Sequence, residues 1–75
     1  MSTKVHSSLL RLVGARIRKA RQKNAMTQEK LAEAVNMDRS YVSGLERGEF
    51  NMSLLTLAKI ARALSISLAA LVSGE

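Results

Sequence analysis

Apolar side chains recur every three or four residues along the chain, which is the spacing of one face of an α-helix. The first such run extends from Ser8 to about Lys23, and its apolar residues are Leu9, Leu12, Val13, Ile17 and Ala20. The arginines and lysines of the same run fall mostly on the other side of the helical wheel. The pattern predicts an amphipathic first helix over residues 8–23, preceded by a mobile arm of residues 1–7.

A short second helix is predicted over residues 28–35. Thr27 precedes it and is a favourable N-cap, because its hydroxyl can accept a hydrogen bond from a free backbone N–H. The apolar residues of its inner face are Leu31, Ala32 and Val35. Asn36 follows. Asparagine is second only to glycine in tolerating the left-handed backbone conformation of a tight turn. The second helix is therefore expected to end in a tight turn.

A third helix of similar length is predicted over residues 39–47. Asp38 before it is a favourable N-cap, and Gly48 after it is a stop signal. The side chains that this helix would bury are Val42 and Leu45.

Two serines introduce the remaining helices. Ser53 would cap a fourth helix with the apolar residues Leu54, Leu57, Ile60, Ala61 and Leu64. Ser67 would cap a short fifth helix with Leu68, Leu71 and Val72. The pattern indicates no strand, repeat or linker, so we predict one all-α domain of five helices over residues 8–75.

Composition narrows the class of protein further. A chain of 75 residues is long enough for one small core. It has no cysteine, so neither a disulfide nor a thiolate metal site is expected, and a reducing cytoplasm is its expected location. No run approaches the roughly 20 apolar residues of a membrane span. The net charge of +6 favours an anionic partner, nucleic acid first and an anionic membrane surface second.

The spacing of the second and third helices fits the DNA-binding helix-turn-helix, in which two short helices cross steeply about a tight turn. A small residue must lie at the crossing, and Ala32 has the expected position. The turn requires a residue that tolerates positive φ, which Asn36 supplies. The apolar seam that the two helices would share consists of Leu31, Val35, Met37, Val42 and Leu45.

From about Leu9 onward the chain resembles the phage repressor and Cro-like (Xre) helix-turn-helix family. The segment that carries the resemblance is "TQEKLAEAVNMDRSYVSGLERGEFNMSLLTLAKIARALSIS". Within it, "MTQEKLA…DRSYVSGLERG" is also similar to the controller proteins of restriction-modification operons. The resemblance implies a five-helix, lambda-repressor-like fold. The family often has glycine where this chain has Ala25, Asn36 and Ser65, and often proline where it has Met52. These departures bear on the backbone conformation of the turns and not on the fold.

The outer side of the third helix is the predicted base-reading surface. Arg39 at its start can donate two parallel hydrogen bonds to guanine, worth roughly 1–3 kcal/mol of base discrimination. Ser40 can reach a base edge or a phosphate, and Ser43 a phosphate first. Tyr41 would contact a thymine methyl or a phosphate, or would simply cover the helix surface. Gly44 costs about 1 kcal/mol of helix propensity, which predicts the close approach of a backbone, either that of a DNA strand or that of the second helix.

Further roles come from the resemblance. It implies a phosphate contact for Gln28 at the start of the second helix, where free N–H groups assist. It implies that three further phosphate contacts flank the groove, namely Arg47, Asn51 and Ser53. It also implies a structural ion pair between Arg21 and Glu46 that joins the first and third helices.

The fifth helix is the predicted dimer interface, formed by Leu68, Leu71 and Val72. Two copies related by a twofold axis would place their reading helices roughly 34–36 Å apart on a near-palindrome. The alternative is that these residues close the core of the single chain.

The predicted function is that of a homodimeric, sequence-specific transcriptional regulator of double-stranded DNA, in one version the controller of a restriction-modification operon. We expect no cofactor, membrane or small-molecule ligand. No metal is expected either, since His6 stands alone in the arm, without a carboxylate or a second histidine at ligand spacing. An enzyme is the least favoured class, because no general acid–base pair is apparent. The alternatives are an antitoxin-type protein interaction module that also binds DNA and a cationic protein of membrane surfaces.

Overall fold

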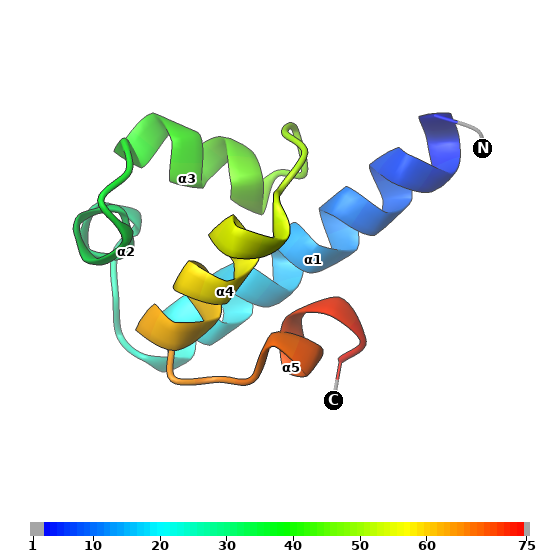
Figure 1. Cartoon of the computed structure of the whole chain (residues 1–75). Helices are drawn as coiled ribbons and strands as arrows, with labels where there is room; N and C mark the ends of the chain where they lie inside the picture. The colour runs from blue at the N-terminus through cyan, green and yellow to red at the C-terminus, as the bar shows by residue number, and fades with distance from the viewer. Residues whose placement is uncertain (1–2, 75) are drawn as a thin grey trace.

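The computed structural model describes the backbone of residues 3–74 and the side chains of residues 8–74 (Figure 1). This part of the chain forms five α-helices and no strand. The helices are α1 (Thr3–Lys23), α2 (Gln28–Val35), α3 (Arg39–Glu46), α4 (Leu54–Ala63) and α5 (Leu68–Val72). The prediction of an all-α, five-helix fold is confirmed.

Helix α1 begins earlier than predicted. It starts at Thr3 instead of Ser8, so most of the segment expected to be an arm is helical, and residues 1–2 lie outside the described part. The sequence from Thr3 onward has neither proline nor an early glycine, and extending a nucleated helix gains a hydrogen bond for each residue. The first turns of α1 project beyond the other helices (Figure 1). Mobility of residues 1–7 stays a prediction.

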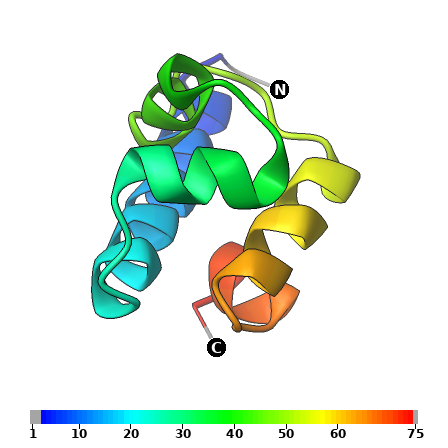
Figure 2. The ribbon, with the colours of Figure 1, turned by 90° about the vertical axis from the view of Figure 1, so that its left-hand side faces the viewer.

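The core is built from all five helices and the residue after α4. Its buried side chains are Val13, Ile17, Leu31, Ala32, Val35, Val42, Leu45, Leu57, Ile60, Ala61, Leu64 and Leu71. Helix α3 packs against α1 and α2, helix α4 packs against α2, and α5 packs against both α1 and α4 (Figure 2). Among the described residues, no helix combines the length and the apolar character needed to cross a membrane.

The role predicted for Leu71 is wrong. Its side chain is completely buried within the single chain, between α5, α1 and α4, so it has no surface to offer a partner. Leu68 is half-buried and also packs against the core, whereas Val72 is 43% exposed. The alternative reading, in which part of α5 closes the monomer core, therefore holds for Leu71. Helix periodicity alone could not show that α5 folds back onto α1.

Capping side chains set where the short helices begin. The hydroxyls of Thr27, Ser53 and Ser67 each accept a hydrogen bond from the backbone N–H three residues ahead, with distances of 3.0 Å. Asp38 has the predicted N-cap position, but its side chain makes no capping hydrogen bond. Three of the four predicted caps therefore satisfy backbone donors of their helices.

Three turns use left-handed backbone without glycine. Asn36 has φ 56°, Ala25 has φ 54° and Ser65 has φ 56°. At these positions the family that the chain resembles often has glycine. The turns therefore keep the left-handed conformation although the residue is different. For a side chain other than glycine this conformation costs roughly 1–2 kcal/mol. Tertiary packing must supply that energy at Ala25 and Ser65.

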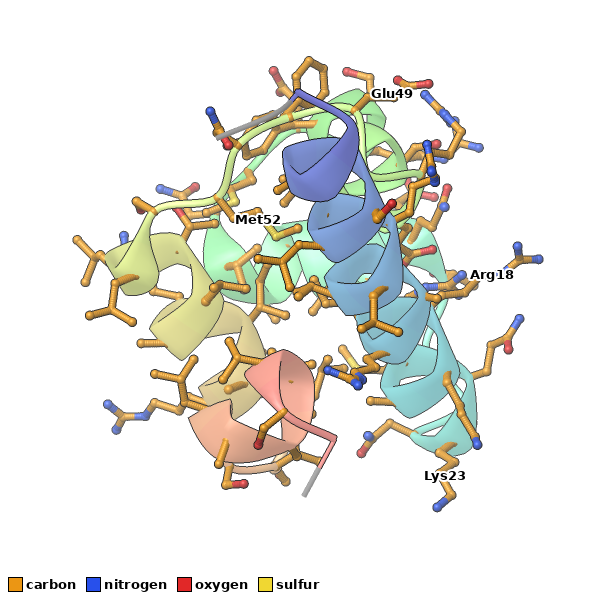
Figure 3. All side chains as sticks on the ribbon, turned by 90° about the vertical axis from the view of Figure 1, so that its right-hand side faces the viewer. Arg18, Lys23, Glu49 and Met52 are labelled. Atoms are coloured by element: carbon orange, nitrogen blue, oxygen red, sulfur yellow. The ribbon has the colours of Figure 1, made fainter. Side chains whose placement is uncertain are left out.

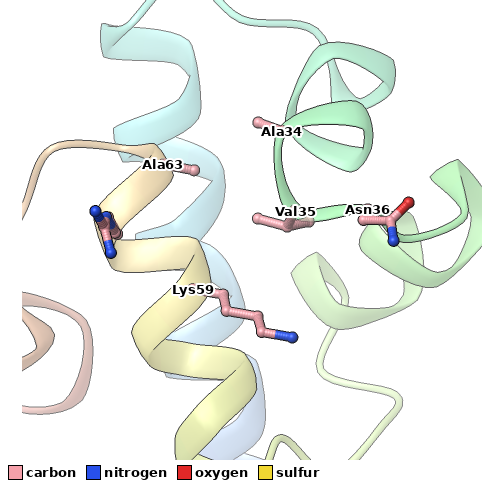
Figure 4. A pocket seen from close by; sticks show the side chains of 6 residues that line it. Ala34, Val35, Asn36, Lys59 and Ala63 are labelled. Atoms are coloured by element: carbon pink, nitrogen blue, oxygen red, sulfur yellow. The ribbon is translucent and has the colours of Figure 1, made fainter.

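Helices α2 and α4 leave a shallow hollow of about 420 Å³ between them (Figure 4). Ala34 and Val35 of α2 face Ala63 of α4, and the side chain of Lys59 extends from α4 toward the α2–α3 turn at Asn36. The small residues allow α4 to support α2 from behind.

Candidate nucleic-acid interface

Helices α2 and α3 form a steeply crossed pair joined by a short turn. Figure 1 shows α3 lengthwise and α2 nearly along its axis. Ala32 lies at the crossing with 3% of its surface exposed, and Val42 and Leu45 hold α3 from behind with no exposed surface. Asn36 ends α2 in the left-handed conformation, and its backbone N–H contacts the last carbonyls of the helix. The geometry required of a helix-turn-helix is therefore present.

The start of α3 presents free polar side chains. Arg39 and Ser40 are exposed, and an open hollow of about 510 Å³ connects Arg39 with Thr27, Gln28 and Glu29 at the start of α2. Helix starts carry backbone N–H groups without helical partners, which attract anions. The structure thus brings two predicted DNA-contacting residues, Arg39 and Gln28, to one surface.

Gln28 is held in place by a buried carboxylate. Glu46 is 7% exposed and receives Arg21 Nε at 2.6 Å, Arg21 Nη2 at 3.0 Å and Gln28 Nε2 at 3.0 Å. Arg21 Nη1 also donates to the carbonyl of Met26 at 2.8 Å. Hydrogen bonding to Glu46 raises the pKa of the Arg21 guanidinium. The ion pair implied by the resemblance is present and joins α1 to α3, and the hydrogen bond from Gln28 connects α2 to the same carboxylate. One N–H of the Gln28 amide remains for an external acceptor.

Arg47 and Ser43 contact each other at the end of α3. Arg47 Nη1 donates to Ser43 Oγ, while its Nε and Nη2 donate to the Glu49 carboxylate at 2.9 and 3.0 Å. These hydrogen bonds, reinforced by the opposite charges, raise the pKa of Arg47 and lower that of Glu49. Both residues stay predictions as DNA contacts. A phosphate would have to replace Glu49, which is feasible because exposed ion pairs are weak.

The two remaining predicted phosphate contacts differ in availability. Asn51 is exposed. The hydroxyl of Ser53 accepts from Thr56 N at 3.0 Å and donates to Thr56 Oγ1 at 2.9 Å. The oxygen of Ser53 therefore caps α4, while its one donor is engaged with the Thr56 hydroxyl, and donation to a phosphate would require it to release Thr56 Oγ1.

Phe50 lies against α3, a contact that the sequence pattern did not predict. Its ring stacks on Tyr41, with centroids 5.4 Å apart and an interplanar angle of 25°. A Cβ added at Gly44 would overlap this ring, reaching 2.7 Å from Phe50 Cδ2. The expectation that Gly44 admits a DNA strand or the second helix is therefore wrong for the free chain, because the phenylalanine side chain fills that space. The one signal in the sequence was Gly44 itself, a glycine inside a helix and three residues after Tyr41, which indicates that something packs closely there.

A second close approach of two backbones, at Gly14, was also not predicted from the sequence. A Cβ added at Gly14 of α1 would lie 2.6 Å from the carbonyl oxygen of Glu46 and would also overlap that of Leu45. Helix α1 therefore touches the backbone at the end of α3. Together with the Arg21–Glu46 pair, this contact fixes how α3 projects from the body.

A steeply crossed helix pair with a buried seam, a left-handed turn and an uncovered second helix defines the helix-turn-helix class of DNA-binding proteins. The chain belongs to the Xre-like helix-turn-helix family (HTH_3), which matches residues 17–71.

Similar proteins include phage repressors and controller proteins. The chain is 44% identical over 63 residues to the immunity repressor protein of Bacillus phage phi105, covering 84% of this chain but only 44% of the repressor. It is 44% identical to the restriction-modification controller protein C.AhdI from Aeromonas hydrophila, with a TM-score of 0.80, covering 83% of this chain and 94% of that one. It is 42% identical to the controller C.Esp1396I, crystallised as a tetramer with its natural 35 base-pair operator, with a TM-score of 0.73 and coverage of 79% and 78%.

Proposed function

We propose that this protein is a sequence-specific transcriptional regulator that inserts α3 into the major groove of double-stranded DNA. The observation that carries the proposal is the placement of Arg39 at the free start of α3, beside Gln28, with Val42 and Leu45 anchoring the helix from behind. A net charge of +6 adds a general attraction for the phosphate backbone. Regulation of a restriction-modification operon is the specific version, and the similarity to C.AhdI and C.Esp1396I supports it.

The proposed regulator acts as a homodimer in the cytoplasm, without a catalytic step or a cofactor. The candidate dimer surface combines the exposed side chains of Leu9 and Leu12 on α1 with Val72 on α5. Leu9 and Val72 line one apolar hollow of about 300 Å³. A pair of chains would bury this surface, and a twofold axis would present two α3 helices to one side of the duplex.

The experiment is a selection of bound duplexes from a random pool by the purified protein. We expect the selected sequences to share a near-palindrome whose half-sites are separated by about one helical turn. A selection that enriches no sequence would contradict the proposed function. Enrichment of a site without symmetry would contradict the homodimer only.

Two substitutions then distinguish a residue that reads a base from a residue that contacts a phosphate. Arg39→Ala should relax the preference at one base pair of each half-site, whereas Gln28→Ala should weaken binding to all sequences alike. Lys23→Ala is the charge control, because it removes one positive charge from the end of α1 and none from α3. In Figure 3 Lys23 lies at the opposite end of the molecule from Glu49, which follows α3. Equal loss on selected and random DNA for Arg39→Ala would remove it from the reading surface.

A second candidate is an antitoxin-type module that also binds a protein partner. Leu54 and Leu55 at the start of α4 favour it, because they are adjacent in the chain and 69% and 65% exposed, and neighbouring exposed apolar side chains mark interaction surfaces. Leu55→Gln should abolish capture of such a partner and leave the dimer intact. If Leu55→Gln instead dissociates the dimer, α4 belongs to the dimer surface.

A further inference from the structure

Phe50 has an unusual place for a large apolar side chain. It lies in the loop between α3 and α4, is 43% exposed, and packs on α3 at Tyr41 and Gly44. On a helical wheel Gly44 falls on the same outward side as Ser40, opposite the buried Val42. Phe50 therefore covers part of the side of α3 that faces away from the core.

The aromatic pair is held in a defined position. The two rings stack closely, and the absence of a side chain at Gly44 allows the Phe50 ring to lie directly on the α3 backbone. Any larger residue at position 44 would displace that ring. A glycine in a helix interior lowers helix propensity, so this position gives up local stability for the ring contact.

We infer that Phe50 is a specificity-determining residue, which forms with Tyr41 an apolar surface for the C5-methyl group of one thymine in each half-site. The inference rests on the proposed function. The thymine methyl is the one apolar group that the bases present in the major groove. The exposed part of Phe50 supplies apolar surface on the outward side of α3, the helix that also carries the exposed Arg39 and Ser40. Guanine is read by charge and hydrogen bonds, and thymine by contact with the ring.

The test replaces single thymidines of the selected duplex with 2′-deoxyuridine, which removes only the methyl group. With the unchanged protein, one position in each half-site should lose affinity by about fourfold, the effect of one buried methyl-sized group. With Phe50→Ala, the thymidine and deoxyuridine duplexes should bind equally at that position. Preference for the guanine read by Arg39 should stay as in the unchanged protein.

Gly44→Ala provides a variant that does not depend on loss of stability. The added methyl group displaces the Phe50 ring, while alanine favours the helix over glycine. We expect it to lose the thymidine preference as Phe50→Ala does, without a lower Tm. Phe50→Leu should retain part of the preference, because leucine keeps apolar surface at the site.

Other outcomes would overturn the inference in distinct ways. If Phe50→Ala weakens thymidine and deoxyuridine duplexes by the same factor at every position, Phe50 only supports the loop. If the affected positions respond to sugar or phosphate changes and not to the methyl group, the ring contacts the DNA backbone. If the unchanged protein selects no sequence at all, the proposed function fails and the role of Phe50 fails with it.

Discussion

The buried carboxylate of Glu46 offers the strongest test of how α3 is held. Glu46→Ala removes three hydrogen bonds and leaves the Arg21 guanidinium without its anion at a site where only 11% of that side chain is exposed. Breaking a buried pair from one side typically costs 3–5 kcal/mol. Arg21 keeps its hydrogen bond to Met26 and some access to water, so we expect the lower end, about 3 kcal/mol.

This loss is a large fraction of the whole stability. A domain of 75 residues is typically stable by roughly 4–11 kcal/mol. At about 4–8 °C for each kcal/mol, Glu46→Ala should lower Tm by about 12–24 °C. The measurement is thermal unfolding followed by circular dichroism at 222 nm, with urea unfolding as an independent check.

Controls separate the buried pair from loss of charge. Glu49→Ala also removes a carboxylate bound to an arginine, but both partners are exposed, so Tm should stay close to that of the unchanged protein. In the Glu46→Ala background, Arg21→Ala should lower the free energy of unfolding by less than it does in the unchanged protein. The reason is that the Glu46 carboxylate, which Arg21→Ala would otherwise leave buried and unpaired, is already absent. A Tm within about 4 °C of the unchanged protein for Glu46→Ala would refute the reasoning.

Three further predictions concern stability and assembly. Gly14→Ala should lower the free energy of unfolding by about 2 kcal/mol despite the better helix propensity of alanine, because the added Cβ meets backbone carbonyls at the end of α3 that cannot move independently. Urea unfolding measures the change, and an unchanged midpoint of the urea transition would contradict the prediction. Ala25→Gly and Ser65→Gly should each leave stability equal or raise it by up to about 1 kcal/mol, since both residues have positive φ; clear destabilisation by both would contradict this. Leu71→Ala should lower the free energy of unfolding by about 2–5 kcal/mol, whereas Val72→Ala should change it little and weaken the proposed dimer in analytical ultracentrifugation. The reverse pattern would contradict the assignment of Leu71 to the core.

The helix boundaries were predictable where the signals are local. Capping hydroxyls at Thr27, Ser53 and Ser67 mark the starts of three helices, and the structure uses each of them as predicted. The start of α1 has no such marker, and the prediction was wrong by five residues. A helix without a stop signal continues as long as each added residue gains a backbone hydrogen bond.

The candidate site was predictable in its direction but not in its side-chain contacts. Burial of Val42 and Leu45 fixes which side of α3 is free, so the exposure of Arg39 and Ser40 followed from periodicity alone. The hydrogen bond between Gln28 and Glu46 could not be predicted from periodicity, because the two residues lie on different helices. Contacts between side chains of different elements depend on distances that no local pattern contains.

The sequence by itself determined the all-α class, the turn after α2 and the free side of α3, since each depends on neighbours within a few residues. The tertiary structure decided that Leu71 belongs to the core and that Phe50 lies on Gly44. It also decided that Glu46 binds Arg21 and Gln28 together. Each of these contacts joins residues from different elements, and only the packing of the helices brings them within reach of one another.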